Sequence, residues 1–160
     1  VRGVMLGSAK APLHLVADAS AREALLATQP EAALVAESLP MRANLSMLEN
    51  VALVAQFRRD LSFDAAAALV ERLLERAGYA DSALRRDPDL DREERFVAKF
   101  LRAALMAAPI IIVDRPALLL PDIPPAPFLD RMLTRLADDY DTCWIVDYAW
   151  NASLYAPRPD

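Results

Sequence analysis

Two short segments carry the side chains best suited to hold a metal ion or a phosphate group. The first is the apolar run Ile110 to Val113, which predicts a strand buried on both faces and leads directly into Asp114. Open α/β sheets bind ligands at the carboxyl ends of their strands, so Asp114 is a candidate for holding Mg²⁺ through water. Alternatively, its carboxylate caps the following loop or pairs with a neighbouring base.

The residue after Asp114 is Arg115, and it limits the chemistry of this site. A carboxylate here would accept a proton from an attacking water, whereas a guanidinium stays protonated at any working pH and cannot. The two side chains are expected either to form a local ion pair or to face opposite ways. The sequence thus predicts a buried strand whose tip is not equipped for hydrolysis.

The second segment is residues 4–12 (VMLGSAKAP), in which Gly7 and Ser8 precede Lys10. Phosphate-binding loops use glycines so that backbone N–H groups can wrap the phosphates, and they add a lysine and a hydroxyl. Other residues stand where those glycines and hydroxyls are expected, namely Val4, Ala9, Ala11 and Pro12. Residues 1–12 are therefore either a relic of such a loop, with Lys10 as a phosphate ligand, or an ordinary hairpin with a solvated lysine.

Composition excludes several other classes of protein. A net charge of −5 argues against a nucleic-acid partner, because such binding depends on clustered Lys and Arg. A single cysteine, Cys143, and a single histidine, His14, leave no internal disulfide and no zinc site built from several Cys or His. No apolar run reaches the roughly 18 to 20 residues of a membrane helix. We therefore expect a cytoplasmic protein that reaches a membrane only through a partner.

The predicted elements alternate between strands and helices, which indicates βαβ units and a mostly parallel sheet. Strands are expected at 1–7, 12–18, 32–37, 110–113 and 143–149, and helices at 20–29, 45–60, 62–79, 91–108 and 128–140. A polar connector covers 81–90 and a proline-rich loop covers 116–127. The predicted fold class is α/β, in a single domain over residues 1–160 with 45–106 as a helical subdomain.

Residues at the predicted helix ends support these assignments. Asn44 and Ser62 are good N-caps for the second and third helices, and Gly78 is suited to end the third. Asp91 is followed three residues later by Glu94, which is the pattern of a capping box.

Five segments, taken in order, resemble the ATP-binding-cassette (ABC) ATPases. LPMRANLSMLENVAL (39–53) is similar to the segment after the Q-loop, and ERLLERAGYAD (71–81) to the helix and turn that follow. LDREERFVAKFLRAAL (90–105) stands at the signature helix, PIIIVDRP (109–116) at the Walker B strand, and CWIVDYA (143–149) at the strand of the switch histidine. The resemblance implies a reduced P-loop NTPase core with a helical subdomain, closest to bacterial ATPases of lipid or solvent-tolerance transporters.

The family's catalytic positions are degenerate in this sequence. Glu37 stands at the Q-loop glutamine, Asp91, Arg92, Glu93 and Glu94 at the signature Ser-Gly-Gly-Gln, Arg115 at the Walker B glutamate and Tyr148 at the switch histidine. The loop 117–122 has leucines where the family has a polar turn. Leu118 to Leu120 are expected either to plug the nucleotide space or to form an exposed apolar patch for a partner.

The resemblance predicts a non-hydrolysing accessory or regulatory subunit that acts through protein contacts with an ABC permease or an active ATPase subunit. Neither ATP nor Mg²⁺ is then a required cofactor. In the family a permease docks on the surface that corresponds to 37–55, with Asn44, Leu45, Leu48, Glu49 and Asn50 as docking candidates. The alternative is a divergent ATPase that keeps Lys10 and Asp114 as phosphate and metal groups and is completed by a partner. A third class, a stand-alone α/β domain of common ancestry, also stays open.

Overall fold

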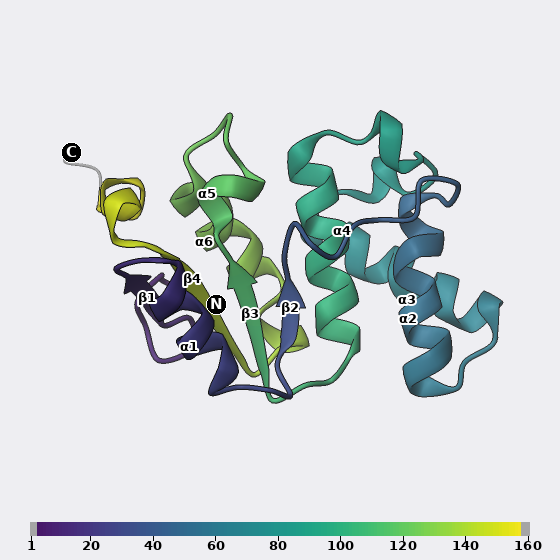
Figure 1. The fold of residues 1–160 in the computed structure, drawn as a ribbon. Coiled ribbons are helices and arrows are strands. Elements are labelled where there is room, and N and C mark those ends of the chain that lie inside the picture. Colours follow the sequence, from purple (N-terminus) through teal and green to yellow (C-terminus); the bar gives the residue numbers. More distant parts are fainter. Residues whose placement is uncertain (1–2, 158–160) are drawn as a thin grey trace.

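The fold was determined as a computed structural model that describes residues 3–157. Predictions that fall on residues 1–2 and 158–160 lie outside the described part of the chain. Within residues 3–157 the sheet has four strands, β1 (Leu13–Val16), β2 (Ala33–Val35), β3 (Ile110–Asp114) and β4 (Thr142–Tyr148). They are all parallel, in the order β1-β4-β3-β2 (Figure 1). The α/β class and the parallel sheet predicted from the sequence are confirmed.

In the part of the chain that the structure describes, six α-helices accompany the sheet: α1 (Ala19–Ala27), α2 (Met47–Arg59), α3 (Phe63–Ala77), α4 (Arg92–Leu105), α5 (Pro116–Leu119) and α6 (Pro125–Arg135). Short 3₁₀ turns lie at Ala80–Ser82, Asp87–Asp89, Ala137–Asp139 and Ala149–Leu154. In Figure 1 the sheet forms one side of the molecule, and α2 and α3 form a helical block on the other, with α4 between them. None of the helices described is both long enough and apolar enough to span a bilayer.

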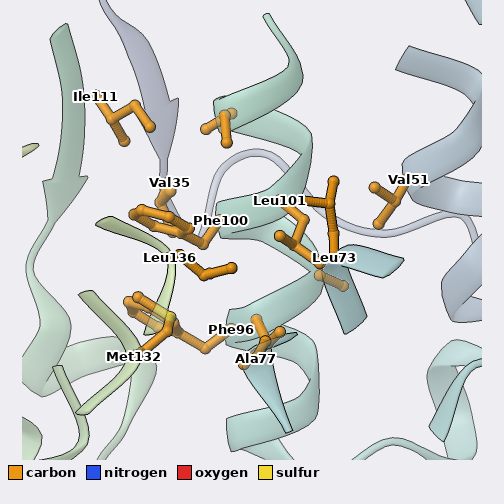
Figure 2. Close-up of a cluster of buried hydrophobic side chains, with 14 of the residues drawn as sticks. Val35, Val51, Leu73, Ala77, Phe96, Phe100, Leu101, Ile111, Met132 and Leu136 are labelled. Carbon is orange, nitrogen blue, oxygen red and sulfur yellow. The ribbon is translucent and has the colours of Figure 1, made fainter. Parts of the chain in front are cut away.

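Helix α4 joins the sheet and the helical block because apolar residues point from it in two directions (Figure 2). Phe96 and Phe100 are fully buried on the side of the sheet and α6, near Val35, Met132 and Leu136. Leu101 lies on the side of α2 and α3, near Val51 and Leu73. One continuous core therefore holds both halves of the protein together.

The helix caps show where local sequence determines the structure and where it does not. Ser62 caps α3, Gly78 ends it in a left-handed conformation (φ 88°), and Asp91 and Glu94 form the predicted capping box of α4. The prediction of Asn44 as the cap of α2 is wrong. Ser46 caps that helix in a capping box with Glu49 instead, and the Ser46 hydroxyl accepts from the Glu49 N–H at 3.1 Å.

Two other predicted elements differ from the structure. The described part of the strand predicted at 1–7 is not a strand, because its N–H groups bond to side chains of α6 rather than to a neighbouring strand. Val4 donates to Thr134 Oγ1 and Leu6 to Asp130 Oδ1. The proline-rich loop at 116–127 contains the single turn α5, and α6 begins at Pro125 rather than at 128, since proline fits the first turn of a helix.

The two-sided core predicts a contrast between two phenylalanines. Phe100→Ala should lower the free energy of unfolding by about 3–5 kcal/mol, because it leaves a cavity in a fully buried site. Phe57→Ala, at a side chain that is 86% exposed, should change it by less than about 0.5 kcal/mol. Urea denaturation of both variants measures the difference, and equal losses would show that α4 does not join the two halves as described.

Candidate functional site

Asp114 is held by a bidentate ion pair with Arg22 at the carboxyl end of the sheet. Arg22 Nε donates to Asp114 Oδ1 at 2.8 Å, and Arg22 Nη2 donates to Asp114 Oδ2 at 2.9 Å. The Asp114 side chain is 4% exposed and that of Arg22 is 17% exposed. Hydrogen bonding to Asp114 raises the pKa of the Arg22 guanidinium, against the opposing effect of burial. Both carboxylate oxygens that a hydrated Mg²⁺ would use are thus engaged by a cation of the chain itself.

Arg22 reaches Asp114 because a short turn joins β1 to α1. Strand β1 ends at Val16, and Asp18 already caps α1 by accepting from the Ala21 N–H at 2.8 Å. This turn occupies the strand–turn–helix position in which phosphate-binding loops occur. It has no glycine and no residue of positive φ, and the first N–H groups of α1 bond to Asp18. A cradle of free N–H groups for a phosphate is therefore absent from residues 17–22 of the described structure.

Arg115 supplies a second cation to the same carboxylate. Its Nε lies 3.4 Å from Asp114 Oδ1, so the ion-pair alternative left open by the sequence is confirmed. Its backbone is left-handed (φ 56°), which is uncommon for a residue with a side chain, and its N–H donates to the Val146 carbonyl at 2.7 Å. The bond to β4 holds the backbone of Arg115 where the guanidinium can lean back over Asp114.

The end of β4 contributes a second buried carboxylate, Asp147, and the aromatic side chain of Tyr148. Asp147 is 1% exposed and accepts hydrogen bonds from the N–H of Ala117, the N–H of Tyr148, the Asn151 amide and the Tyr155 hydroxyl. Burial, together with this carboxylate, raises the pKa of the Tyr155 phenol. The donors come from α5 and from residues 148–155, so the Asp147 carboxylate links β4 to both segments. This is a structural role.

Tyr148 lies where the resemblance places a switch histidine. Its ring stacks on Trp150, with ring centroids 4.1 Å apart, and Tyr148 contributes to raising the pKa of Arg22. The Trp150 side chain is 66% exposed. Tyr148 is thus part of the surroundings of the Arg22–Asp114 pair, and it brings no imidazole chemistry to them.

The structure does not bring Lys10, Gly7 and Ser8 to Asp114. Lys10 Nζ donates to the carbonyls of Tyr140 and Asp141, which precede β4, so it lies at the amino end of the sheet. It also lies 4.4 Å from the centroid of the Tyr140 ring. Gly7 forms a turn with φ 85° in a segment that leads into β1 rather than into a helix. Asp114 lies at the opposite, carboxyl end of the sheet.

The start of α4 is closed by its own side chains. Asp91 accepts from the Glu94 N–H at 2.8 Å, and Glu94, 5% exposed, accepts from the Asp91 N–H and from Arg85. Arg92 pairs with Asp122 at 3.3 Å, and Glu93 is half-buried. Negative side chains at a helix N-terminus stabilise the helix through its dipole, and here they occupy the place of an external anion.

Glu37 and the leucines of α5 surround a small cavity. Glu37 is exposed just after β2 and faces a cavity of about 130 Å³ that Leu118 and Leu119 also line. Leu120 is buried, whereas Leu118 is 42% exposed. Leu118 is thus exposed, as the apolar-patch alternative expects, and Leu120 belongs to the core. That the run plugs the nucleotide space stays a prediction.

The residues predicted for partner docking divide into buried and exposed positions. Leu48 and Asn50 are buried, and the Asn50 amide bonds to backbone groups of Arg42, Leu45 and Ser46. Leu45 is half-buried, Glu49 is used in the capping box, and Asn44 is exposed. Within the described chain, Asn50 thus fixes the segment before α2.

Two adjoining grooves lie beside this segment. One, of about 460 Å³, is lined by residues that include Arg42, Asn50, Leu53 and Phe57. The other, of about 360 Å³, includes Leu34 and Leu39. Both are bordered by Val54, Arg102 and Met106, which makes them one continuous surface. No group of three or more His, Cys, Asp or Glu that could hold a metal ion occurs among residues 3–157.

Arg22 is the site residue that the sequence analysis missed. Its signal was present, since an arginine in the first turn of a helix that follows a strand is placed near the carboxyl ends of neighbouring strands. It could not be assigned to Asp114 without knowing that β1 and β3 flank β4.

Comparisons with known proteins give a fold and no close relative. No family model matches the sequence, and no curated protein matches it. Among solved structures, a metal-chelate-type ABC transporter in an inward-facing conformation matches with a TM-score of 0.65 and 15% identity, over 84% of this chain and 61% of that one.

Two structures of MJ0796 also match. The dimeric structure of this bacterial ABC transporter cassette has a TM-score of 0.60 and 20% identity, over 79% of this chain and 56% of that one. A post-hydrolysis dimer bound to ADP and Pi has a TM-score of 0.60 and 21% identity, over 86% and 59%. The chain spans about three fifths of the length of the solved structures it matches. The fold expected from the resemblance to ABC ATPases is confirmed.

The Arg22–Asp114 pair predicts a specific pattern in a double-mutant cycle. Arg22→Met should lower the free energy of unfolding by about 1–3 kcal/mol, less than the roughly 3–5 kcal/mol of a fully buried pair because Arg22 is partly exposed. Adding Asp114→Asn should restore part of the loss, because the buried charge is then removed.

Arg76→Met is the matched control, since Arg76 forms an ion pair with Asp139 at the surface and is 45% exposed. It should change stability by less than about 1 kcal/mol. Urea denaturation of Arg22→Met, Asp114→Asn, the double variant and the Arg76→Met control, each against the unaltered chain, measures the cycle. A purely additive double variant would show that Arg22 and Asp114 are not coupled.

Proposed function

We propose that this chain, which has the fold of an ABC transporter ATP-binding cassette, is a non-hydrolysing accessory or regulatory subunit of an ABC transporter. It acts by contacting a permease or an active ATPase subunit, at the membrane periphery. The observation that carries the proposal is the bidentate ion pair by which Arg22 engages both oxygens of Asp114.

Three features at the carboxyl end of the sheet support the absence of hydrolysis. The carboxylate of Asp114 is neutralised by Arg22 and Arg115, so a hydrated Mg²⁺ would have to displace cations rather than bind a free acid. Arg115 cannot accept a proton from water. The turn at 17–18 offers no glycine-rich cradle for a triphosphate. A free carboxylate for the metal, a base for the attacking water and a glycine-rich loop for the phosphates are thus each lacking among the described residues at this end of the sheet.

The continuous groove beside α2 supports the proposal of a protein partner. Its apolar members include Leu53 and Phe57, and the Phe57 side chain is 86% exposed. Arg42 and Arg58 are exposed at the same groove, and Arg102 donates to the carbonyls of Leu39 and Pro40, which fixes one wall. A groove lined by apolar residues and arginines suits an amphipathic helix that carries acidic residues, such as a short helix of a permease.

A second candidate function is a divergent ATP-binding subunit with partner-completed activity. The observation that favours it is the partial exposure of Arg22, whose guanidinium could turn from Asp114 to a phosphate. In that case Asp114 would be released for Mg²⁺ at the moment of nucleotide binding. The two candidates differ in whether nucleotide binds the folded chain.

Thermal denaturation with Mg²⁺-ATP separates the two candidates. The proposal predicts that millimolar Mg²⁺-ATP raises the melting midpoint no more than an equal concentration of inorganic phosphate with Mg²⁺. A ligand at about 100 times its Kd would add roughly 2.7 kcal/mol, which is several degrees at this size. A larger shift with ATP that Arg22→Met abolishes would support the ATP-binding candidate and overturn the proposal.

Co-purification tests the groove. Phe57→Asp should abolish recovery of ABC transporter components that the unaltered chain recovers when expressed in its native cells, because it places a charge among the apolar residues that line the groove. Phe63→Asp, at another exposed phenylalanine that does not line the groove, is the matched control and should keep the partner. Equal recovery by both variants, or recovery of no transporter component by the unaltered chain, would count against this surface.

A further inference from the structure

The cavity between α4, α5 and the end of β2 is lined by a buried lysine that forms no ion pair within residues 3–157. Lys99 is 6% exposed, and its Nζ donates to the Ala36 carbonyl at 3.1 Å. An ammonium has three donors, and this is its only hydrogen bond within residues 3–157. None of the ion pairs described includes it. A buried charge ordinarily requires a partner, and the described residues leave two of the three Lys99 donors unused.

Two further cations face the same cavity from the same helix. Arg92, Arg95 and Lys99 are spaced three and four residues apart, which places them along one face of α4. Arg95 is held rigidly, because it donates to Asp87 Oδ1 at 2.8 Å and to the carbonyls of Asp87 and Leu90. Arg92 lies at the mouth, 55% exposed, with Asp122 as its only ion-pair partner among the described residues.

The remaining walls make the cavity selective for a small anion. Phe96, Leu118 and Leu119 supply an apolar lining, which strengthens electrostatic attraction by lowering the local dielectric. Among the described residues that line the cavity, Glu37 is the only acid, and it is exposed. The volume of about 130 Å³ is close to the roughly 150 Å³ of a cavity that takes up benzene, so a single small group fits.

We infer that this cavity binds a small oxyanion of the size of phosphate or sulfate, with Lys99 as the buried ligand and Arg92 and Arg95 closing the mouth. The Lys99 ammonium donates one hydrogen bond to the Ala36 carbonyl, and its other two N–H groups would donate charge-assisted hydrogen bonds to the anion. Burial, followed by the neighbouring Arg102 and Arg95, lowers the pKa of Lys99, while Glu37 and Asp87 act in the opposite direction, as a bound anion would. The inference does not depend on Arg22 or Asp114 and is separate from the proposed function.

Titration with inorganic phosphate, against chloride at equal ionic strength, tests the site. Phosphate at about five times its Kd should raise the melting midpoint of the unaltered chain by about 2–4 °C and should give a 1:1 isotherm in calorimetry. Phosphate also stabilises proteins generally by exclusion from their surfaces, so the variants carry the test. Lys99→Met should weaken binding about tenfold or more, because it removes the buried charge while keeping a similar shape.

Lys10→Met is the matched control, because Lys10 is the only other lysine in the chain and lies at the opposite end of the sheet. It should keep the phosphate response, and so should the Arg22→Met/Asp114→Asn double variant. Glu37→Gln should strengthen binding several-fold, since it removes the acid that lines the cavity.

If Lys99→Met fails to fold, Arg92→Gln at the exposed mouth replaces it and should weaken binding several-fold. A phosphate response that is the same in the Lys99→Met and Lys10→Met variants would overturn the inference. The inference would also be overturned if neither phosphate nor sulfate gave a 1:1 isotherm with the unaltered chain.

Discussion

A carboxylate buried at the end of a parallel strand must be neutralised, and that requirement organises this end of the protein. Asp114 is 4% exposed, and leaving it unpaired would cost several kcal/mol. The chain meets the need with Arg22 from α1 and Arg115 from the residue that follows. The short turn between β1 and α1 and the left-handed backbone at Arg115 both serve to place those guanidinium groups.

The same helix determines the stability of the fold and the surface that it offers to ligands. Along α4, Phe96 and Phe100 face the sheet and Leu101 faces α2 and α3, so its position is fixed from both sides. A helix held in this way can carry a buried charge such as Lys99 without rearranging. The capping box of Asp91 and Glu94 fixes where the helix begins, and hence which turn presents Arg92 and Arg95.

Local signals in the sequence predicted local structure well, and long-range pairing only in part. Ser62, Gly78 and the Asp91–Glu94 box were identified because a cap depends on residues three or four positions apart. The strands at 110–114 and 142–148 were visible as apolar runs. Ser46 was missed because Asn44 and Ser46 are both good caps, and the choice follows from bonds of α2 to residues 83 and 85. Arg22 and Lys99 were missed because their partners lie on elements distant in sequence.

The Arg22–Asp114 pair can be regarded as an internal ligand. An intramolecular partner competes at an effective concentration that free ligands rarely reach, commonly millimolar or above. A nucleotide entering this site would therefore need to separate the pair and leave Asp114 facing only Arg115 at 3.4 Å. Magnesium could compensate for that loss only by reaching the same two oxygens that Arg22 engages. The charge that the buried Asp114 requires is thus supplied by side chains of the same chain, Arg22 and Arg115, and the end of β3 is held without an external ligand.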